Sequence, residues 1–163
     1  MQLKKWLTLL LAAAGIGVMV FYATCETDCS YLQGDIFGID LKYIGIAFMA
    51  FVIGLILVNQ TDIIRLLLAG ACGGEVVLVT FQFREDVFCP FCLTFGAIIV
   101  LLYFIHYSGA QKDDPLARQL LFAPGSATVP FLKLRVPLLA VMVLGFLFMT
   151  LFFTGSVTPS YGA

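Results

Sequence analysis

The stretch Trp6–Thr24, WLTLLLAAAGIGVMVFYAT, decides the fold class of this chain. It contains no charged side chain, and the charges nearest to it are Lys5 before it and Glu26 after it. A helix of about 20 mostly apolar residues is long enough to cross the hydrocarbon core of a bilayer. The stretch therefore predicts a transmembrane helix near the start of the chain.

The composition of the whole chain extends this prediction. Of its 163 residues, 61% are apolar and 12% are charged, and the net charge is −1. Soluble domains have about 25% charged residues, so this composition argues against a soluble enzyme. Disordered chains are poor in apolar residues, and a net charge near zero gives no electrostatic basis for binding nucleic acid. We therefore expect a membrane protein that contacts lipid and binds no nucleic acid.

Four further apolar stretches are expected to cross the membrane, namely Tyr43–Gln60, Ile63–Phe83, Val87–Tyr107 and Val136–Gly155. Together the five stretches predict an all-α integral membrane protein with a four-helix transmembrane bundle plus a fifth transmembrane helix. We expect the four-helix bundle at residues 1–107, with an outer cysteine loop at about 25–41. A cytoplasmic loop is expected at 108–134, and the fifth helix with a short outer tail at 135–163.

Basic residues orient the predicted bundle, because loops on the cytoplasmic side are enriched in Lys and Arg. With a cytoplasmic N-terminus, seven of the nine lie inside: Lys4, Lys5, Arg65, Lys112, Arg118, Lys133 and Arg135. We expect a multi-pass protein of the cell inner membrane with its active site on the outer face. The N-terminus also has features of a cleavable signal peptide, but Tyr22-Ala23-Thr24 fits a cleavage site poorly.

Five cysteines carry the chemical information: Cys25, Cys29, Cys72, Cys89 and Cys92. On the expected topology, one close pair lies in the first outer loop and another at the outer start of the fourth helix. Both pairs then face the side of the membrane where disulfides persist. The topology and the cysteine placement therefore support each other.

The sequence Cys89-Pro90-Phe91-Cys92 is a C-x-x-C pair at a predicted helix start. A helix N-terminus favours a thiolate through its free N–H groups and its dipole, and proline suits the first helical position. The pair is a candidate redox dithiol. A structural disulfide and half of a metal site are the alternatives.

The loop pair Cys25 and Cys29 has the spacing C-x-x-x-C, and the segment Ser30–Leu41 after it is expected to lie on the outer membrane surface. Two dithiols on one face can form a relay by thiol–disulfide exchange. Two static disulfides are one alternative. Another is binding or transport of soft metal ions such as copper or mercury, for which thiolates are suitable ligands. We assign no metal ligand, because the single histidine, His106, lies at the inner end of the fourth helix.

Glu75 is the one acidic residue well inside a predicted span, and intramembrane ionisable residues are functional candidates. Electrons from a dithiol in the membrane need an acceptor, and a bilayer-dissolved quinone is the simplest. Glu75 is a candidate to relay protons to the quinone or to bind its ring. Phe88, Phe91 and Phe95 are candidates to line the ring site, although packing is the usual role of phenylalanine in a membrane protein.

With these motifs the chain resembles the vitamin K epoxide reductase family, especially its bacterial members, over roughly Trp6–Tyr107. The resemblance lies in a first helix ending at Cys25, then Cys29-Ser30, Phe37-Gly38-Ile39, a second helix containing Gly45, and Cys89-Pro90-Phe91-Cys92. The chain departs from vitamin K-reducing members at Gly96, where they carry a tyrosine.

The resemblance implies a four-helix bundle around a quinone, either ubiquinone or menaquinone, with Cys25, Cys29, Cys89 and Cys92 as catalytic residues. It implies that Cys92 faces the quinone, that Cys89 exchanges with Cys29, and that Cys25 meets a thioredoxin-like partner. Bacterial relatives often carry that partner as a fused domain. Because this chain ends at Ala163, a separate extracytoplasmic partner is expected.

Together these observations predict a membrane thiol:quinone oxidoreductase that supports disulfide formation in exported proteins.

Overall fold

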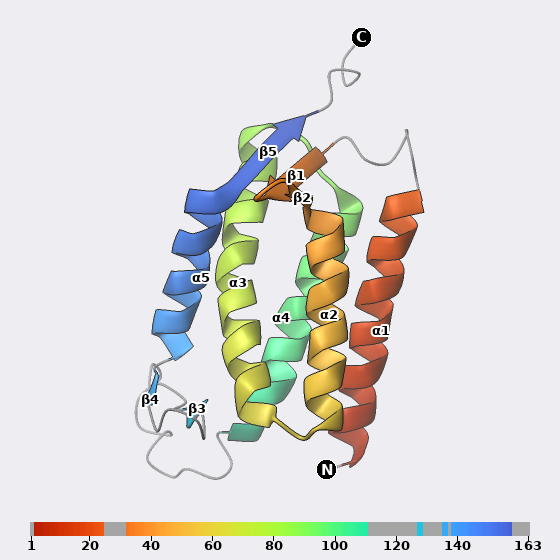
Figure 1. Cartoon of the computed structure of the whole chain (residues 1–163), viewed down its shortest axis with the longest axis vertical. Coiled ribbons are helices and arrows are strands. Elements are labelled where there is room, and N and C mark those ends of the chain that lie inside the picture. Colours follow the sequence, from red (N-terminus) through yellow and green to blue (C-terminus); the bar gives the residue numbers. More distant parts are fainter. Residues whose placement is uncertain (1, 25–31, 111–126, 129–134, 137, 158–163) are drawn as a thin grey trace.

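The computed structural model describes residues 2–24, 32–110, 127–128, 135–136 and 138–157. Within them the chain is mostly helical, with α1 at Gln2–Thr24, α2 at Leu41–Leu57, α3 at Thr61–Arg84, α4 at Pro90–Ala110 and α5 at Leu138–Phe152. The helices lie side by side and alternate in direction (Figure 1), so that α1, α3 and α5 run one way and α2 and α4 the other. This arrangement follows the predicted order of spans.

Three of these helices are long and apolar enough to cross a membrane, namely Leu3–Thr24, Thr61–Arg84 and Pro90–Tyr107. Between 22% and 33% of the apolar window in each segment is buried inside the protein, so much of their apolar surface remains at least partly exposed. Such an apolar exterior is stable in lipid, and the chain is a membrane protein. The helices α2 and α5 are also apolar but shorter, with 17 and 15 residues.

The second and third predicted spans correspond to α2 and α3, which are joined by a tight turn. The turn begins after Leu57, and Asn59 adopts a positive φ of 62°, a conformation that asparagine tolerates better than most residues. Lys5 Nζ donates a hydrogen bond to the side-chain oxygen of Asn59. The predicted span Tyr43–Gln60 therefore ends about one turn earlier than expected.

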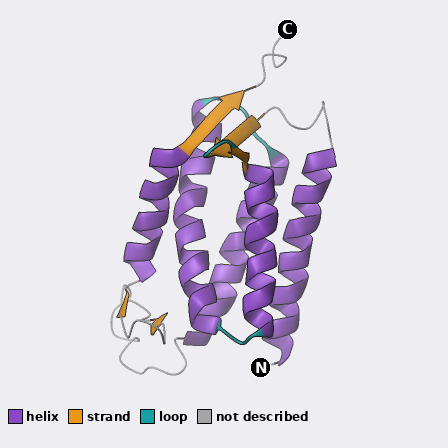
Figure 2. Ribbon diagram, in the orientation of Figure 1, coloured by secondary structure: helices purple, strands orange, loops and turns teal. Residues whose placement is uncertain are grey.

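A small antiparallel sheet lies at the end of the bundle where α1 ends and α4 begins (Figure 2), and its strands are β1 (Leu32–Ile36), β2 (Ile39–Asp40) and β5 (Phe153–Val157). The strand order is β2-β1-β5. Phe37 and Gly38 both have positive φ, 56° and 77°, as a two-residue hairpin turn with native twist requires. The described part of the chain is therefore mostly helical, as predicted, but the all-α prediction did not include the small sheet at this end.

The strand β5 also shortens the fifth predicted span. Val136–Gly155 was expected to be helical, but α5 ends at Phe152 and the chain continues as an extended strand. Ile36 pairs with Phe153 and Gly34 with Gly155, so the backbone hydrogen bonds of this segment go to β1. In the predicted loop 108–134, the structure describes a part of α4 and the strand β3 (Ala127–Thr128), which pairs with β4 (Arg135–Val136).

The core lies between the helices and is closed by small residues on α3. The helix α3 packs extensively against α5 and α4, and α1 packs against α2 and α4. A Cβ atom at Gly73 would meet the backbone of Met142, and one at Gly145 would meet the backbone of Gly70. Glycine at positions 73 and 145 therefore permits the close approach of α3 and α5.

The end of the bundle opposite the sheet is held by polar contacts around His106. The Thr8 hydroxyl, which is fully buried, lies 3.2 Å from His106 Nε2. Arg65 Nε donates a hydrogen bond of 3.2 Å to the backbone carbonyl of His106. His106 therefore joins α1, α3 and α4 at the end opposite the dithiol.

Candidate dithiol and cavity site

The C-x-x-C pair lies at the first turn of α4, as its sequence predicts. Cys89 immediately precedes the helix, Pro90 is its first residue, and the Cys89 carbonyl accepts a hydrogen bond from Leu93 N–H at 3.1 Å. The Cys92 thiol donates to Cys89 Sγ across 2.8 Å, and the backbone N–H of Cys92 donates to the same sulfur across 3.3 Å. Both cysteines are free thiols within reach of each other.

These hydrogen bonds make Cys89 the more acidic thiol of the pair. The bond from the Cys92 thiol, helped by the backbone N–H groups of Cys92 and Phe91, lowers the pKa of Cys89 from 9.0 to about 7 against the opposing effect of burial. Hydrogen bonds to a charged form favour that form. Near neutral pH, a substantial fraction of Cys89 is therefore in the thiolate form, the nucleophilic form of a cysteine.

Gln82 on α3 fixes the position of Cys89 from the other side. Its side-chain Oε1 accepts a hydrogen bond of 2.9 Å from the backbone N–H of Cys89, and its side chain is 1% exposed. Sequence reasoning missed this residue. A signal was present, since Gln82 is an uncharged polar residue near the end of an apolar span.

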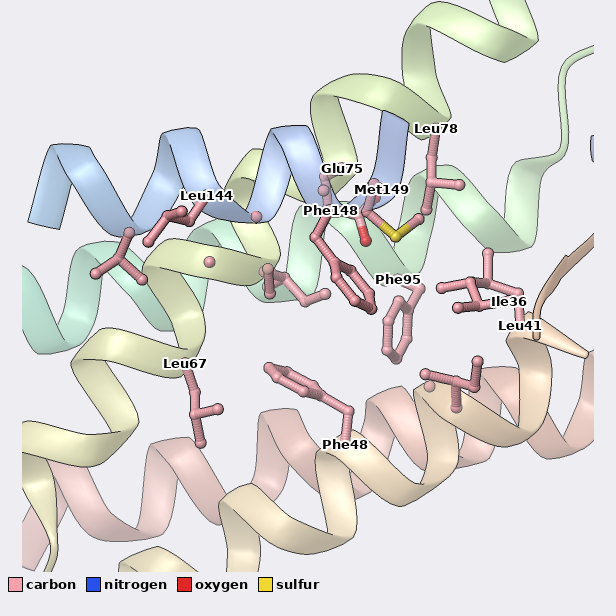
Figure 3. Close-up of a pocket in the computed structure, with 18 of the residues that line it drawn as sticks. Ile36, Leu41, Phe48, Leu67, Glu75, Leu78, Phe95, Leu144, Phe148 and Met149 are labelled. Atoms are coloured by element: carbon pink, nitrogen blue, oxygen red, sulfur yellow. The ribbon is translucent and has the colours of Figure 1, made fainter. Parts of the chain in front are cut away.

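A large apolar cavity of about 770 Å³ lies between the helices, and Cys92 lies on its wall. The walls come from α2, α3, α4 and α5, with Met19 from α1 and Ile36 from β1. Figure 3 shows the rings of Phe48, Phe95 and Phe148 pointing into this space. Along α3 the lining runs from Ile63 to Leu78, which corresponds to about 22 Å at 1.5 Å per residue.

The candidate ring-binding residues separate into two groups in the structure. Phe95 and Glu75 line the cavity. Phe91 instead packs against Phe21 and Tyr22, with ring centroids 5.6 and 5.8 Å apart. Phe88 is 53% exposed and packs edge-on against Phe83 at 5.4 Å. The structure therefore brings Cys89, Cys92, Phe95 and Glu75 together and leaves Phe88 and Phe91 outside the cavity lining.

Sequence reasoning missed the contribution of α5 to the cavity. Leu144, Phe148 and Met149 line one wall (Figure 3), although the predicted bundle ended at residue 107. An apolar helix gives no sequence signal to distinguish a cavity wall from a face in lipid.

Glu75 stands out in this lining because of its carboxyl group. Its partly buried side chain makes no hydrogen bond or ion pair with any residue in the described part of the chain. A Cβ atom placed on Gly96 of α4 would lie 2.6 Å from Glu75 Oε2. The carboxyl therefore occupies room that exists because residue 96 has no side chain.

Of the other three cysteines, only Cys72 lies within the described residues. Cys72 is buried in the core on α3, apart from the first turn of α4. Cys25 and Cys29 lie outside the described residues. Among residues 2–24, 32–110 and 138–157 no group of three or more His, Cys, Asp or Glu side chains forms a metal site.

Comparison of the chain with protein-family models, with curated proteins and with solved structures finds no match.

Proposed function

We propose that this protein is a membrane thiol:quinone oxidoreductase. The observation that carries the proposal is the position of Cys92, which shares a hydrogen bond of 2.8 Å with Cys89 and also lines an apolar cavity of about 770 Å³. A dithiol next to such a cavity is arranged to pass electrons to an apolar acceptor. The resemblance of residues 6–107 to the vitamin K epoxide reductase family supports the same activity.

The cavity has the size and chemistry for an isoprenoid quinone. Its volume lies in the range of small-molecule sites, about 300–1,000 Å³, and its length along α3 exceeds that of a ring alone. The polar side chains, Glu75 and Cys92, belong to the lining near the dithiol end, whereas the Ile63 end is apolar. The ring is therefore expected near Cys92 and the prenyl tail toward Ile63.

The electrons follow a path of thiol–disulfide exchange. A reduced thioredoxin-like protein outside the membrane gives two electrons and two protons to the Cys25–Cys29 disulfide. Cys29 then exchanges with Cys89, which leaves Cys89 and Cys92 as the dithiol. That dithiol returns to a disulfide as the quinone gains two electrons and two protons and becomes a hydroquinone.

The proposed topology has all five helices crossing the cell inner membrane, with the N-terminus in the cytoplasm. The excess of Lys and Arg on the N-terminal side supports this orientation. The dithiol and the sheet then lie at the outer face, where a partner that introduces disulfides into exported proteins works.

The experiment is reduction of short-chain ubiquinone and menaquinone by the purified full-length protein, with a dithiol as electron donor. Cys92→Ala is expected to abolish quinone reduction and to accumulate a Cys29–Cys89 disulfide on non-reducing gels. Cys72→Ala is the matched control and keeps the wild-type rate, because Cys72 lies away from the dithiol. Wild-type quinone reduction by Cys92→Ala would overturn the proposal. Stoichiometric copper or mercury binding without quinone reduction would favour the metal alternative instead.

A further inference from the structure

The cavity contains one carboxyl group in walls that are otherwise apolar apart from the Cys92 thiol. Burying a polar group without a hydrogen-bond partner is costly, and ionisable residues inside a membrane protein usually serve function. Glu75 has no such partner among the described residues. Its carboxyl lines the cavity, so a ligand there can form a hydrogen bond with it.

Glu75 and Cys92 face the same part of the cavity. Gly96, which the Glu75 carboxyl contacts, comes four residues after Cys92 on α4. Residues four apart lie on one face of a helix, about 6 Å apart along its axis at 1.5 Å per residue. Phe95 projects into the cavity from the same helix (Figure 3). A ring beside Phe95 would be within reach of both the thiol and the carboxyl.

We propose that Glu75 is the catalytic acid that protonates a quinone oxygen during reduction. This inference rests on the proposed function and assigns the proton-transfer group of that same site. The Cys89–Cys92 dithiol loses two electrons and forms a disulfide, and the quinone gains both electrons. Protonated Glu75 gives its proton to one quinone oxygen and regains a proton from the Cys92 thiol. The second quinone oxygen takes the proton of the Cys89 thiol or, where Cys89 is already ionised, a proton from water, so that two electrons and two protons reach the hydroquinone.

Gly96 is a positioning residue in this proposal. Any side chain at position 96 would overlap the Glu75 carboxyl, since a Cβ atom alone comes within 2.6 Å of Oε2 and 3.2 Å of Cδ. Because the carboxyl is the flexible end of its side chain, it would swing away and the fold would survive. Gly96→Ala should therefore displace the acid without removing it.

The test measures hydroquinone formation in a single turnover, with reduced full-length protein and short-chain ubiquinone. Glu75→Gln, which keeps the shape but lacks the acid, is expected to slow this step about 100-fold, the effect typical of losing a general acid. Glu75→Asp keeps an acid and is expected to retain more activity than Glu75→Gln. A merely structural role predicts the reverse order, because glutamine is the closer match in size.

The pH profile gives a second readout. Only the protonated carboxyl can donate a proton. The wild-type rate of hydroquinone formation should therefore fall with rising pH as Glu75 ionises, and Glu75→Gln should not show this fall. The titratable groups around the site are Cys72 on the same helix and Cys92, Cys89 and Tyr22 on the dithiol side. The cavity residues from α2 and α5 are all apolar. Cys89, Cys92, Cys72 and Tyr22 remain in every Glu75 variant, so the loss of this pH dependence is assigned to the carboxyl.

A double-mutant cycle tests the role of Gly96. Gly96→Ala is expected to slow hydroquinone formation about 10-fold in the wild-type background and to have no effect in Glu75→Ala, because interacting residues are non-additive. Reduction of the Cys89–Cys92 disulfide by dithiothreitol stays unchanged in the Gly96→Ala and Glu75 variants and reports an intact fold. If Glu75→Gln reduces quinone at the wild-type rate while Cys92→Ala does not, this inference fails and the proposed function stands. If Cys92→Ala is also fully active, both fail.

Discussion

The backbone N–H of Cys89 donates a hydrogen bond of 2.9 Å to the side chain of Gln82, and both residues are buried. The bond joins the end of α3 to the residue that precedes α4. It pairs the backbone N–H of Cys89, which would otherwise be an unpaired donor near the start of α4, and it fixes the position of the more acidic thiol. Three observations of this end of the protein, the Gln82 contact, the thiol pair and the Glu75–Gly96 contact, therefore belong to one site.

Replacing Gln82 with leucine removes the acceptor and leaves a buried N–H group unpaired. An unsatisfied buried donor costs about 1–3 kcal/mol, so Gln82→Leu is expected to lower the free energy of unfolding by that amount. Thermal melting of the detergent-solubilised protein measures the effect. Thr80→Val is the matched control on the same helix, because Thr80 is exposed and bonds only to its own helix at Val76 O. Equal melting temperatures for both variants would contradict the structural role of Gln82.

The pH dependence of thiol reactivity follows from the pKa of Cys89, which is lowered from 9.0 to about 7 chiefly by the Cys92 thiol. Alkylation of reduced Cys89 by a small reagent should rise with a midpoint near pH 7. Cys92→Ala removes the main donor, so the midpoint should move up toward 9. Rates are measured by mass spectrometry in a background that lacks Cys25, Cys29 and Cys72 and keeps Cys89, with or without Cys92.

The same shift has a consequence for stability. A thiol whose pKa is lowered by folding stabilises the reduced protein above its unfolded value of 9.0, and this contribution is lost as the pH falls through about 7. The reduced wild-type protein should therefore lose more stability between pH 9 and pH 7 than Cys89→Ala does. Parallel stability curves for the two proteins would argue against a lowered pKa.

The hairpin between β1 and β2 turns at Phe37 and Gly38, which both have positive φ. Gly38 has φ of 77°, and no atom lies within 4 Å of the place where its Cβ would be. Alanine is disfavoured at positive φ, so Gly38→Ala should destabilise the protein by about 1 kcal/mol. Gly17 in α1 also has open space but a helical backbone, and Gly17→Ala should stabilise by about 0.5–1 kcal/mol. Thermal melting that moves in the same direction for both variants would contradict this account.

Local rules explain which features of this protein the sequence predicts. The start of α4 at Pro90 follows from the preference of proline for the first turn, and Glu75 is conspicuous because charge is scarce elsewhere. The strand β5 could not be predicted, because Phe153–Val157 is extended only through its pairing with β1. Phe91 and Phe95 are four residues apart on α4, a spacing shared by every apolar pair on one helix face, so the sequence does not distinguish their environments. Tertiary packing decides that Phe91 meets α1 and Phe95 lines the cavity.

The contact between α3 and α5 gives the last prediction, because α5 forms a wall of the cavity. A Cβ at Gly145 would overlap the backbone of Gly70, whereas a Cβ at Gly70 would meet Val141 Cγ1 at an ordinary 3.6 Å. Gly145→Ala must therefore push the two helices apart, and overpacking of this kind costs about 1–3 kcal/mol. Gly70→Ala places the same methyl group in the same interface and should change stability little.

The two variants should also differ in substrate binding if the cavity holds the quinone. Moving α5 displaces Leu144, Phe148 and Met149 from the wall, so Gly145→Ala should raise the KM for quinone more than it lowers kcat. Gly70→Ala should leave KM close to that of the wild type. Only Gly145→Ala forces α3 and α5 apart. If Gly70→Ala raised the KM for quinone and Gly145→Ala did not, the spacing of these helices would not shape the quinone site.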